Sequence, residues 1–191
     1  LHTATHVRRG LKEFRKDNDG ALSYMKSVSC SGHRPTATGM PGYKVPNDKY
    51  NWLIESTKKC FEALNPDVVN VGGALGFDFY AGTAALEMNI PIISFIPFLG
   101  QEKMWPEESQ KAYHNLLSKS KEVVIVCSGG YAAWKMQRRN EAMTDAISDD
   151  GCLLACFNGD KGGTFNCVEY AKSKNKRIVR IDPTLQTIEG L

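Results

Sequence analysis

Two glycine pairs, each set between an apolar run and an amphipathic stretch, are the residues whose types and spacing best suit chemistry. The first lies in V-V-N-V-G-G-A-L-G-F-D, residues 68–78, and the second in L-L-A-C-F-N-G-D-K-G-G-T, residues 153–164. Glycine lets the backbone approach a ligand closely and adopt positive φ without steric cost. The helix expected after each pair would present free N–H groups and a positive dipole end, which favour phosphate. Two such turns predict a nucleotide site, although glycine also simply tightens strand-to-helix corners.

Ionisable and aromatic side chains gather in the loops between the expected elements. His33 and Arg34 follow the first expected strand, where they could contact phosphate or protonate a departing base; a loop histidine can also simply bond backbone. The aromatic residues Trp105, Tyr131 and Trp134 are candidates for stacking on a nucleobase. For Trp105, a role as a cover over the core is an equal alternative. We expect the glycine-rich run before Tyr131 to form a flexible lid over the pocket.

The elements that must position these residues alternate along the chain. Apolar, β-branched runs predict strands at 27–30, 67–71, 90–96, 122–126, 151–157 and 177–181. Amphipathic periodicity predicts helices at 48–64, 77–88, 106–118, 138–148 and 164–174. This order indicates an α/β fold, a Rossmann-like, doubly wound, mainly parallel sheet with helices on both faces. Such sheets bind ligands at the carboxyl ends of their strands, so both glycine turns should lie at one edge.

Length and composition predict one nucleotide-binding domain at 27–191, preceded by a basic arm or helix at 1–26. The 191 residues are 42% hydrophobic with a net charge of +3, too small a charge to argue for nucleic acid. The six cysteines include no C-x-x-C pair, so we expect reduced thiols and no metal. No apolar run approaches a membrane span of about 20 residues, and the first 20 residues lack the apolar core of a signal peptide. We therefore expect a cytoplasmic protein without membrane contact.

Read together, four loop motifs resemble those of the SLOG superfamily. They are S-G-H-R-P at 31–35, G-G-A-L-G-F-D at 72–78, R-R-N-E-A-M at 138–143 and G-D-K-G-G-T at 159–164. The order is most similar to the YpsA-like branch and more distantly to the LOG (lysine-decarboxylase-like) phosphoribohydrolases, over about residues 27–182. The resemblance implies a nucleotide or nucleotide-derived ligand. We expect no cofactor. LOG enzymes hydrolyse the N-glycosidic bond of nucleoside 5′-monophosphates and form dimers, so a homodimer or higher oligomer is expected by resemblance.

The resemblance also assigns residues. Arg139 and Met143 fit the LOG pattern R-x-x-x-M, which would place the Arg139 guanidinium over the site, where its planar fork suits phosphate. The turn ending at Thr164 matches the LOG phosphate-binding turn in position but is shorter. The predicted ligand-binding residues are Gly32, Arg34, Gly72, Gly73, Gly76, Ser128, Gly129, Arg138, Asn140, Gly162, Gly163 and Thr164.

One departure from the LOG pattern concerns catalysis. LOG enzymes carry a glutamate close after the threonine, whereas the first acid after Thr164 here is Glu169, which we expect to face solvent. The predicted catalytic residues are therefore Asp78, Arg139 and His33, with Asp78 equally interpretable as a charge that stabilises its helix dipole. The leading hypothesis is hydrolysis of a nucleotide N-glycosidic bond; the alternative is a non-catalytic nucleotide binder. SLOG relatives that bind single-stranded DNA offer a third class, disfavoured by the weak net charge.

Overall fold

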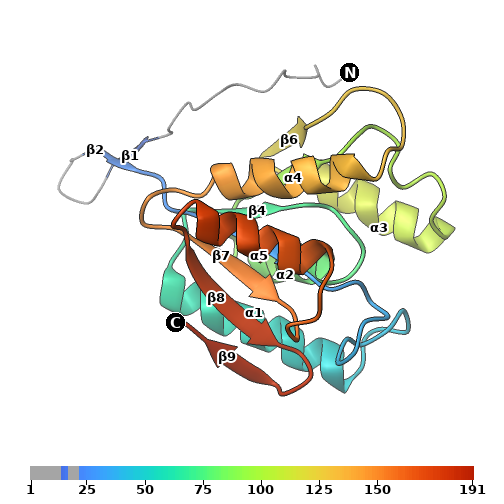
Figure 1. The fold of residues 1–191 in the computed structure, drawn as a ribbon, viewed down its shortest axis with the longest axis horizontal. Helices are drawn as coiled ribbons and strands as arrows, with labels where there is room; N and C mark the ends of the chain where they lie inside the picture. The colour runs from blue at the N-terminus through green and yellow to red at the C-terminus, as the bar shows by residue number, and fades with distance from the viewer. Residues whose placement is uncertain (1–13, 17–21) are drawn as a thin grey trace.

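The structure, a computed structural model, describes residues 14–16 and 22–191 (Figure 1). Within the predicted arm at 1–26, strands β1 (Phe14–Lys16) and β2 (Leu22–Tyr24) pair antiparallel as a separate two-stranded sheet. The rest of that prediction, residues 1–13 and 17–21, lies outside the described residues.

A seven-stranded sheet forms the centre of the domain. Its strands, in chain order, are β3 (Ser27–Gly32), β4 (Val68–Val71), β5 (Ile92–Ile96), β6 (Glu122–Ile125), β7 (Cys152–Cys156), β8 (Arg177–Asp182) and β9 (Thr187–Glu189). They lie in the order β6-β5-β4-β3-β7-β8-β9, and every neighbouring pair is parallel except β8 with β9. The predicted Rossmann-like, mainly parallel sheet is confirmed.

Five helices cover the two faces of this sheet. They are α1 (Asp48–Leu64), α2 (Phe77–Glu87), α3 (Glu107–Ser118), α4 (Trp134–Asp145) and α5 (Gly163–Ser173). The larger apolar cluster packs α1, α2 and Leu116 of α3 against β3, β4, β7 and β8. A smaller cluster packs α5 against the opposite face of β7, and α4 lies beside α5 (Figure 1). The connections therefore wind on both sides, as the strand order requires.

The direction of the chain reverses beside β3. From β3 the strands progress outward through β4 and β5 to the edge strand β6, and the chain then returns to place β7 on the other side of β3. Because β3, β4 and β7 are parallel, the loops that follow them emerge at one edge. Both glycine-rich turns lie there, so their predicted placement at a common carboxyl edge is confirmed. In this architecture that edge, at the reversal point, is where ligands bind.

Helix α4 differs from its prediction at both ends, because it spans Trp134–Asp145 rather than 138–148. Its first turn forms early, where the N–H of Lys135 donates to Ala132 O at 3.0 Å. At the other end, the N–H of Ser148 donates to the Ser27 hydroxyl at 2.7 Å and leaves the helix. This tertiary hydrogen bond lies just past the C-terminal end of α4, which is at Asp145, although the apolar periodicity of the sequence continues to residue 148.

Side-chain hydrogen bonds help attach α4 to the central strands, beside the buried Met143. Ser29 Oγ donates to Met143 O at 2.6 Å, and Ser27 Oγ donates to Ala146 O at 2.8 Å. Asn70 on β4 donates through Nδ2 to Ser29 Oγ at 3.0 Å. Hydrogen bonds are directional, so these contacts fix how far along β3 the helix sits.

Candidate functional site

The first glycine-rich turn is closed by a buried ion pair. Arg139 of α4 donates through Nη1 to Gly72 O, and the same nitrogen lies 3.3 Å from Asp78 Oδ2. Its Nε donates to Asn140 Oδ1 at 2.9 Å. Arg139 and Asp78 are only 5% and 3% exposed. Residues 61 positions apart in the chain thereby neutralise each other against the end of β4.

Burial dominates the protonation equilibria of this pair. Desolvation raises the pKa of Asp78, and the nearby positive charges of Arg139 and Arg34 oppose that shift. Desolvation likewise lowers the pKa of Arg139, opposed by the negative charge of Asp78. Each charge therefore depends on the other, which makes the pair a structural unit of the turn.

The glycines of the first turn are required by this close packing. A Cβ at Gly72 would collide with the Arg139 guanidinium and the Asp78 carboxylate, and a Cβ at Gly76 would collide with His33 O. Gly76 also has φ +101°, which side chains rarely adopt. The two other predicted glycines near this turn are constrained for the same two reasons. A Cβ at Gly32 would collide with the Phe77 side chain, and Gly73 has φ +64°, which side chains rarely adopt.

The second glycine-rich turn, in contrast, is open. Gly162 and Gly163 are exposed, and no heavy atom of the described residues lies within 4 Å of a Cβ built on either one. Gly162 is the N-cap of α5 and has no side chain with which to cap the first N–H groups, while Thr164 behind it is buried. Free N–H groups and the positive dipole end at such a terminus attract anions.

One dipeptide of α4 joins the two turns. Arg139 bonds Gly72 in the first turn, and its neighbour Asn140 donates through Nδ2 to Gly163 O at 3.4 Å in the second. The structure therefore brings the two turns together around α4, although 90 residues of sequence separate them.

The loop after β3 supplies the remaining predicted residues of this edge. His33 Nε2 lies 2.8 Å from Asn158 Oδ1 and 3.2 Å from the Asn158 backbone nitrogen, which joins the loops after β3 and β7 at the reversal point. Arg34 is exposed, and its charge acts on both Asp78 and Arg139. In the part of the chain that the structure describes, Arg34 makes no salt bridge, so its charge has no carboxylate partner within 4.0 Å.

The predicted aromatic residues separate into two environments. Trp105 is half-buried and packs edge-on against Tyr113, with ring centroids 5.4 Å apart. Tyr131 and Trp134 are 76% and 60% exposed, at the carboxyl side of β6. Arg138, one turn along α4, is exposed and paired with Glu141 at 2.6 Å.

Sequence reasoning missed Lys135, which organises the loop containing Ser128 and Gly129. Its Nζ donates to Ser128 O and Gly130 O, each at 2.6 Å, and the residue is 6% exposed. No signal in the sequence marked it, because the helix was predicted to begin only at residue 138, and Lys135 lies in the first turn of α4 as the structure has it.

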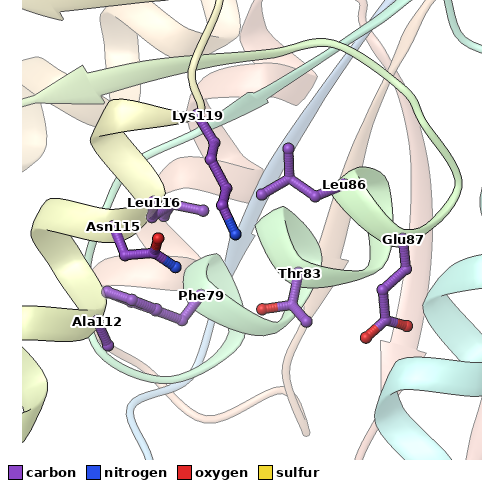
Figure 2. A pocket seen from close by; sticks show the side chains of 8 residues that line it. All are labelled: Phe79, Thr83, Leu86, Glu87, Ala112, Asn115, Leu116 and Lys119. Carbon is purple, nitrogen blue, oxygen red and sulfur yellow. The ribbon is translucent and has the colours of Figure 1, made fainter.

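A groove between α2 and α3, about 360 Å³ in volume, lies apart from this edge (Figure 2). Its lining is Phe79, Thr83, Leu86, Glu87, Ala112, Asn115, Leu116 and Lys119, none of them a predicted site residue. Over residues 14–16 and 22–191, no three His, Cys, Asp or Glu side chains are arranged to hold a metal ion. No described helix combines the length and apolarity needed to cross a membrane.

The strand order and the loop edge define a Rossmann-like α/β protein. The chain belongs to the YpsA family, described as the YspA SLOG family, whose model matches residues 28–185. This finding confirms the resemblance drawn from the four loop motifs.

Relatives and solved structures agree with that membership. The prophage-derived protein YoqJ of Bacillus subtilis (strain 168), described as uncharacterized, is 33% identical over 117 residues, which cover 53% of this chain and 67% of YoqJ. A UPF0398 protein of Bacillus cereus (strain B4264) is 26% identical over 165 residues, 80% of this chain and 85% of that protein.

Two structures of DNA processing protein A share the fold. The Helicobacter pylori protein, whose structure concerns a single-stranded DNA binding mode, has a TM-score of 0.59 at 16% identity, covering 82% of this chain and 65% of its own. The Streptococcus pneumoniae protein has a TM-score of 0.58 at 16% identity, covering 83% and 50%. The present chain thus spans two thirds or less of these longer proteins.

Proposed function

We propose that this protein binds a nucleotide whose phosphate lies on the N-terminus of α5, beside Arg34, at the reversal point between β3 and β7. The observation that carries the proposal is the open second turn, where Gly162 and Gly163 leave the first N–H groups of α5 unobstructed. A phosphate there would receive backbone hydrogen bonds in a favourable dipole field.

Arg34 supplies the charge that the site needs. The Asp78–Arg139 pair is internally neutral and buried, so it adds little net attraction for an anion. Arg34 is exposed beside that pair, and a guanidinium can donate two parallel hydrogen bonds to one phosphate. In this proposal Arg139 has a positioning role, because it holds both turns in place.

The geometry favours binding over hydrolysis. Cleavage of an N-glycosidic bond requires a carboxylate that can stabilise the developing positive charge on the ribosyl centre. Asp78 is 3% exposed and engaged by Arg139, and His33 Nε2 is engaged by Asn158. We therefore place the non-catalytic binder first and keep N-glycosidic hydrolysis as the reaction to be tested.

Thermal unfolding with a panel of ligands tests the proposal. The panel contains the four common nucleoside 5′-monophosphates, ribose 5-phosphate and a single-stranded DNA oligonucleotide, which the Helicobacter pylori neighbour justifies. A ligand at 100 times its Kd should add about 2.7 kcal/mol of stability. Gly163→Val, which places a branched side chain over the free N–H groups, should abolish that gain while its own unliganded melting temperature stays close to the original.

Two outcomes would contradict the proposal: no stabilisation by any nucleotide, or undiminished stabilisation of a folded Gly163→Val protein. Stabilisation by the oligonucleotide alone would indicate that the ligand of this site is single-stranded DNA and not a nucleotide. Chromatography of each nucleotide after incubation tests hydrolysis separately, since release of a free base would show turnover.

A further inference from the structure

A buried ammonium group holds the loop between β6 and α4. Lys135 is 6% exposed, and its Nζ donates to the carbonyls of Ser128 and Gly130 at 2.6 Å each. The same Nζ lies 5.5 Å from the ring centroid of Phe98 and 5.7 Å from that of Trp134. One side chain therefore contacts both the loop and the aromatic residues around it.

The buried position of the Lys135 ammonium group is energetically unfavourable by itself. Among the described residues it makes no salt bridge with a carboxylate, and burial of an ammonium group without one is unfavourable. It also lies in the first turn of α4, where the helix dipole opposes a positive charge. The two carbonyls and the aromatic faces are what compensate it.

The ordered loop displays an aromatic surface. Tyr131 packs edge-on against Phe98, with centroids 6.1 Å apart, yet remains 76% exposed. Trp134, whose ring centroid lies 5.7 Å from Lys135 Nζ, is 60% exposed. Flat aromatic rings of this kind stack on other flat rings.

We propose that Tyr131 and Trp134 form a nucleobase subsite and that Lys135 is the positioning residue that holds it. This inference rests on the proposed function, because it gives the base of a phosphate-anchored nucleotide its place. It narrows the ligand class to compounds that carry a phosphate and an aromatic base at opposite ends.

The two proposed subsites lie along one helix. Trp134 and Asn140 are six residues apart on α4, which corresponds to a rise of about 9 Å and a rotation of about 240°, so a ligand that reaches both sites must bend around the start of the helix. Asn140 contacts Gly163 O in the turn proposed to take the phosphate. The helix thus carries the aromatic subsite at its start and touches the anion site near its middle.

Three probes separate the two subsites: adenosine 5′-monophosphate has both groups, adenosine lacks the phosphate, and ribose 5-phosphate lacks the base. Lys135→Met keeps the length and loses the donors, so affinity for the monophosphate and for adenosine should fall at least tenfold. Affinity for ribose 5-phosphate should not change. Lys135→Arg, which can still donate to the carbonyls, should recover most of the loss.

A matched control and an optical signal complete the experiment. Lys172→Met, on the exposed side of α5 in a salt bridge with Glu169, should bind all three probes like the original protein. Adenosine should quench tryptophan emission, and Trp134→Phe should remove that quenching. Because Trp134 is exposed, this variant is expected to fold even if Lys135→Met does not.

The outcomes distinguish this inference from the proposed function. Unchanged adenosine affinity in Lys135→Met and Trp134→Phe overturns the subsite, and an equal loss for ribose 5-phosphate shows a general structural defect instead. If adenosine binds in a Lys135-dependent way but ribose 5-phosphate does not bind, the subsite stands and the phosphate site fails. Failure of all three probes to bind the unmodified protein overturns both.

Discussion

The two glycine-rich turns look alike in sequence and differ in what surrounds them. In the first, Gly72 and Gly76 are glycines because the protein's own atoms occupy the space that a side chain would take. In the second, Gly162 and Gly163 face open space at the start of α5. The same strand–glycine–helix pattern therefore occurs in two settings. The first turn is closely packed, whereas the second is open and has a backbone conformation at Gly162, φ +155°, that side chains rarely adopt.

This difference also divides the two arginines of the edge. The Arg139 guanidinium is engaged in contacts with Gly72, Asp78 and Asn140. Arg34, in contrast, is exposed. A guanidinium that closes a turn should affect stability when removed, and one that faces solvent should affect binding. Substitutions in both turns and at both arginines can break or sharpen this division.

The largest effect is expected for Arg139→Ala. Removal of the guanidinium leaves the buried Asp78 carboxylate without its partner, and breaking such a pair costs about 3–5 kcal/mol. Urea unfolding should show that loss. The neighbouring Arg138→Ala, exposed and paired only with Glu141, is the matched control and should unfold like the original protein. Equal stability of the two variants would contradict the closed-turn interpretation.

Arg34→Ala should reverse the pattern, with intact stability and weaker binding. Loss of a hydrogen bond to a charged group costs about 1.5–3 kcal/mol in affinity. Titration with adenosine 5′-monophosphate measures it, and Arg34→Lys should recover only part, because a point charge lacks the planar fork. Lys44→Ala, an exposed cation in the same loop, should bind normally. If Arg34→Ala bound as tightly as Lys44→Ala, the phosphate would have to lie elsewhere.

Gly72→Ala should destabilise the protein without any ligand. The added methyl group would displace Arg139 and Asp78, and overpacking of this kind costs about 1–3 kcal/mol. Thermal unfolding detects the change. A melting temperature equal to that of the original protein would mean that the first turn can accommodate a methyl group at position 72, which contradicts the close packing described above.

Gly163→Ala should produce the smallest effect, in the opposite direction. The position is open and helical, so alanine should stabilise the domain by about 0.4–1 kcal/mol through the unfolded state. Comparison of unfolding midpoints for Gly72→Ala and Gly163→Ala then tests the two turns against each other. Destabilisation by both would remove the distinction between them.

Much of the fold could be predicted from the sequence, because local signals define its elements. Helix α1 has the predicted bounds: Asn47 accepts a hydrogen bond from the Tyr50 N–H at one end, and Asn65 adopts a left-handed conformation at the other. Strands covered on both faces are apolar throughout and stand out as β4 and β7. The short strand β9, with exposed residues at both ends, has no such signal and was missed.

The contacts of the site could not be predicted in the same way. The Asp78–Arg139 pair joins residues 61 positions apart, and nothing local marks either one as buried. Lys135 precedes the helix predicted at 138–148, and its role appears only once the carbonyls of Ser128 and Gly130 are placed around it. These roles depend on how α4 crosses the sheet, which no sequence window contains. The sequence predicted which loops lie at the carboxyl edge of the sheet. It did not predict which residues of those loops are buried and paired with one another.

The hydrogen bonds that attach α4 to β3 also limit how this chain can vary in length. Ser29 bonds Met143 O and Ser27 bonds Ala146 O, while Arg139, one turn earlier, must reach Gly72. Each residue inserted or deleted between 139 and 143 would rotate the start of α4 by about 100° relative to its anchored end. The guanidinium would then face away from Asp78. We expect relatives that keep this arginine to keep the number of residues after it, and to accommodate insertions in the loops on either side of the helix.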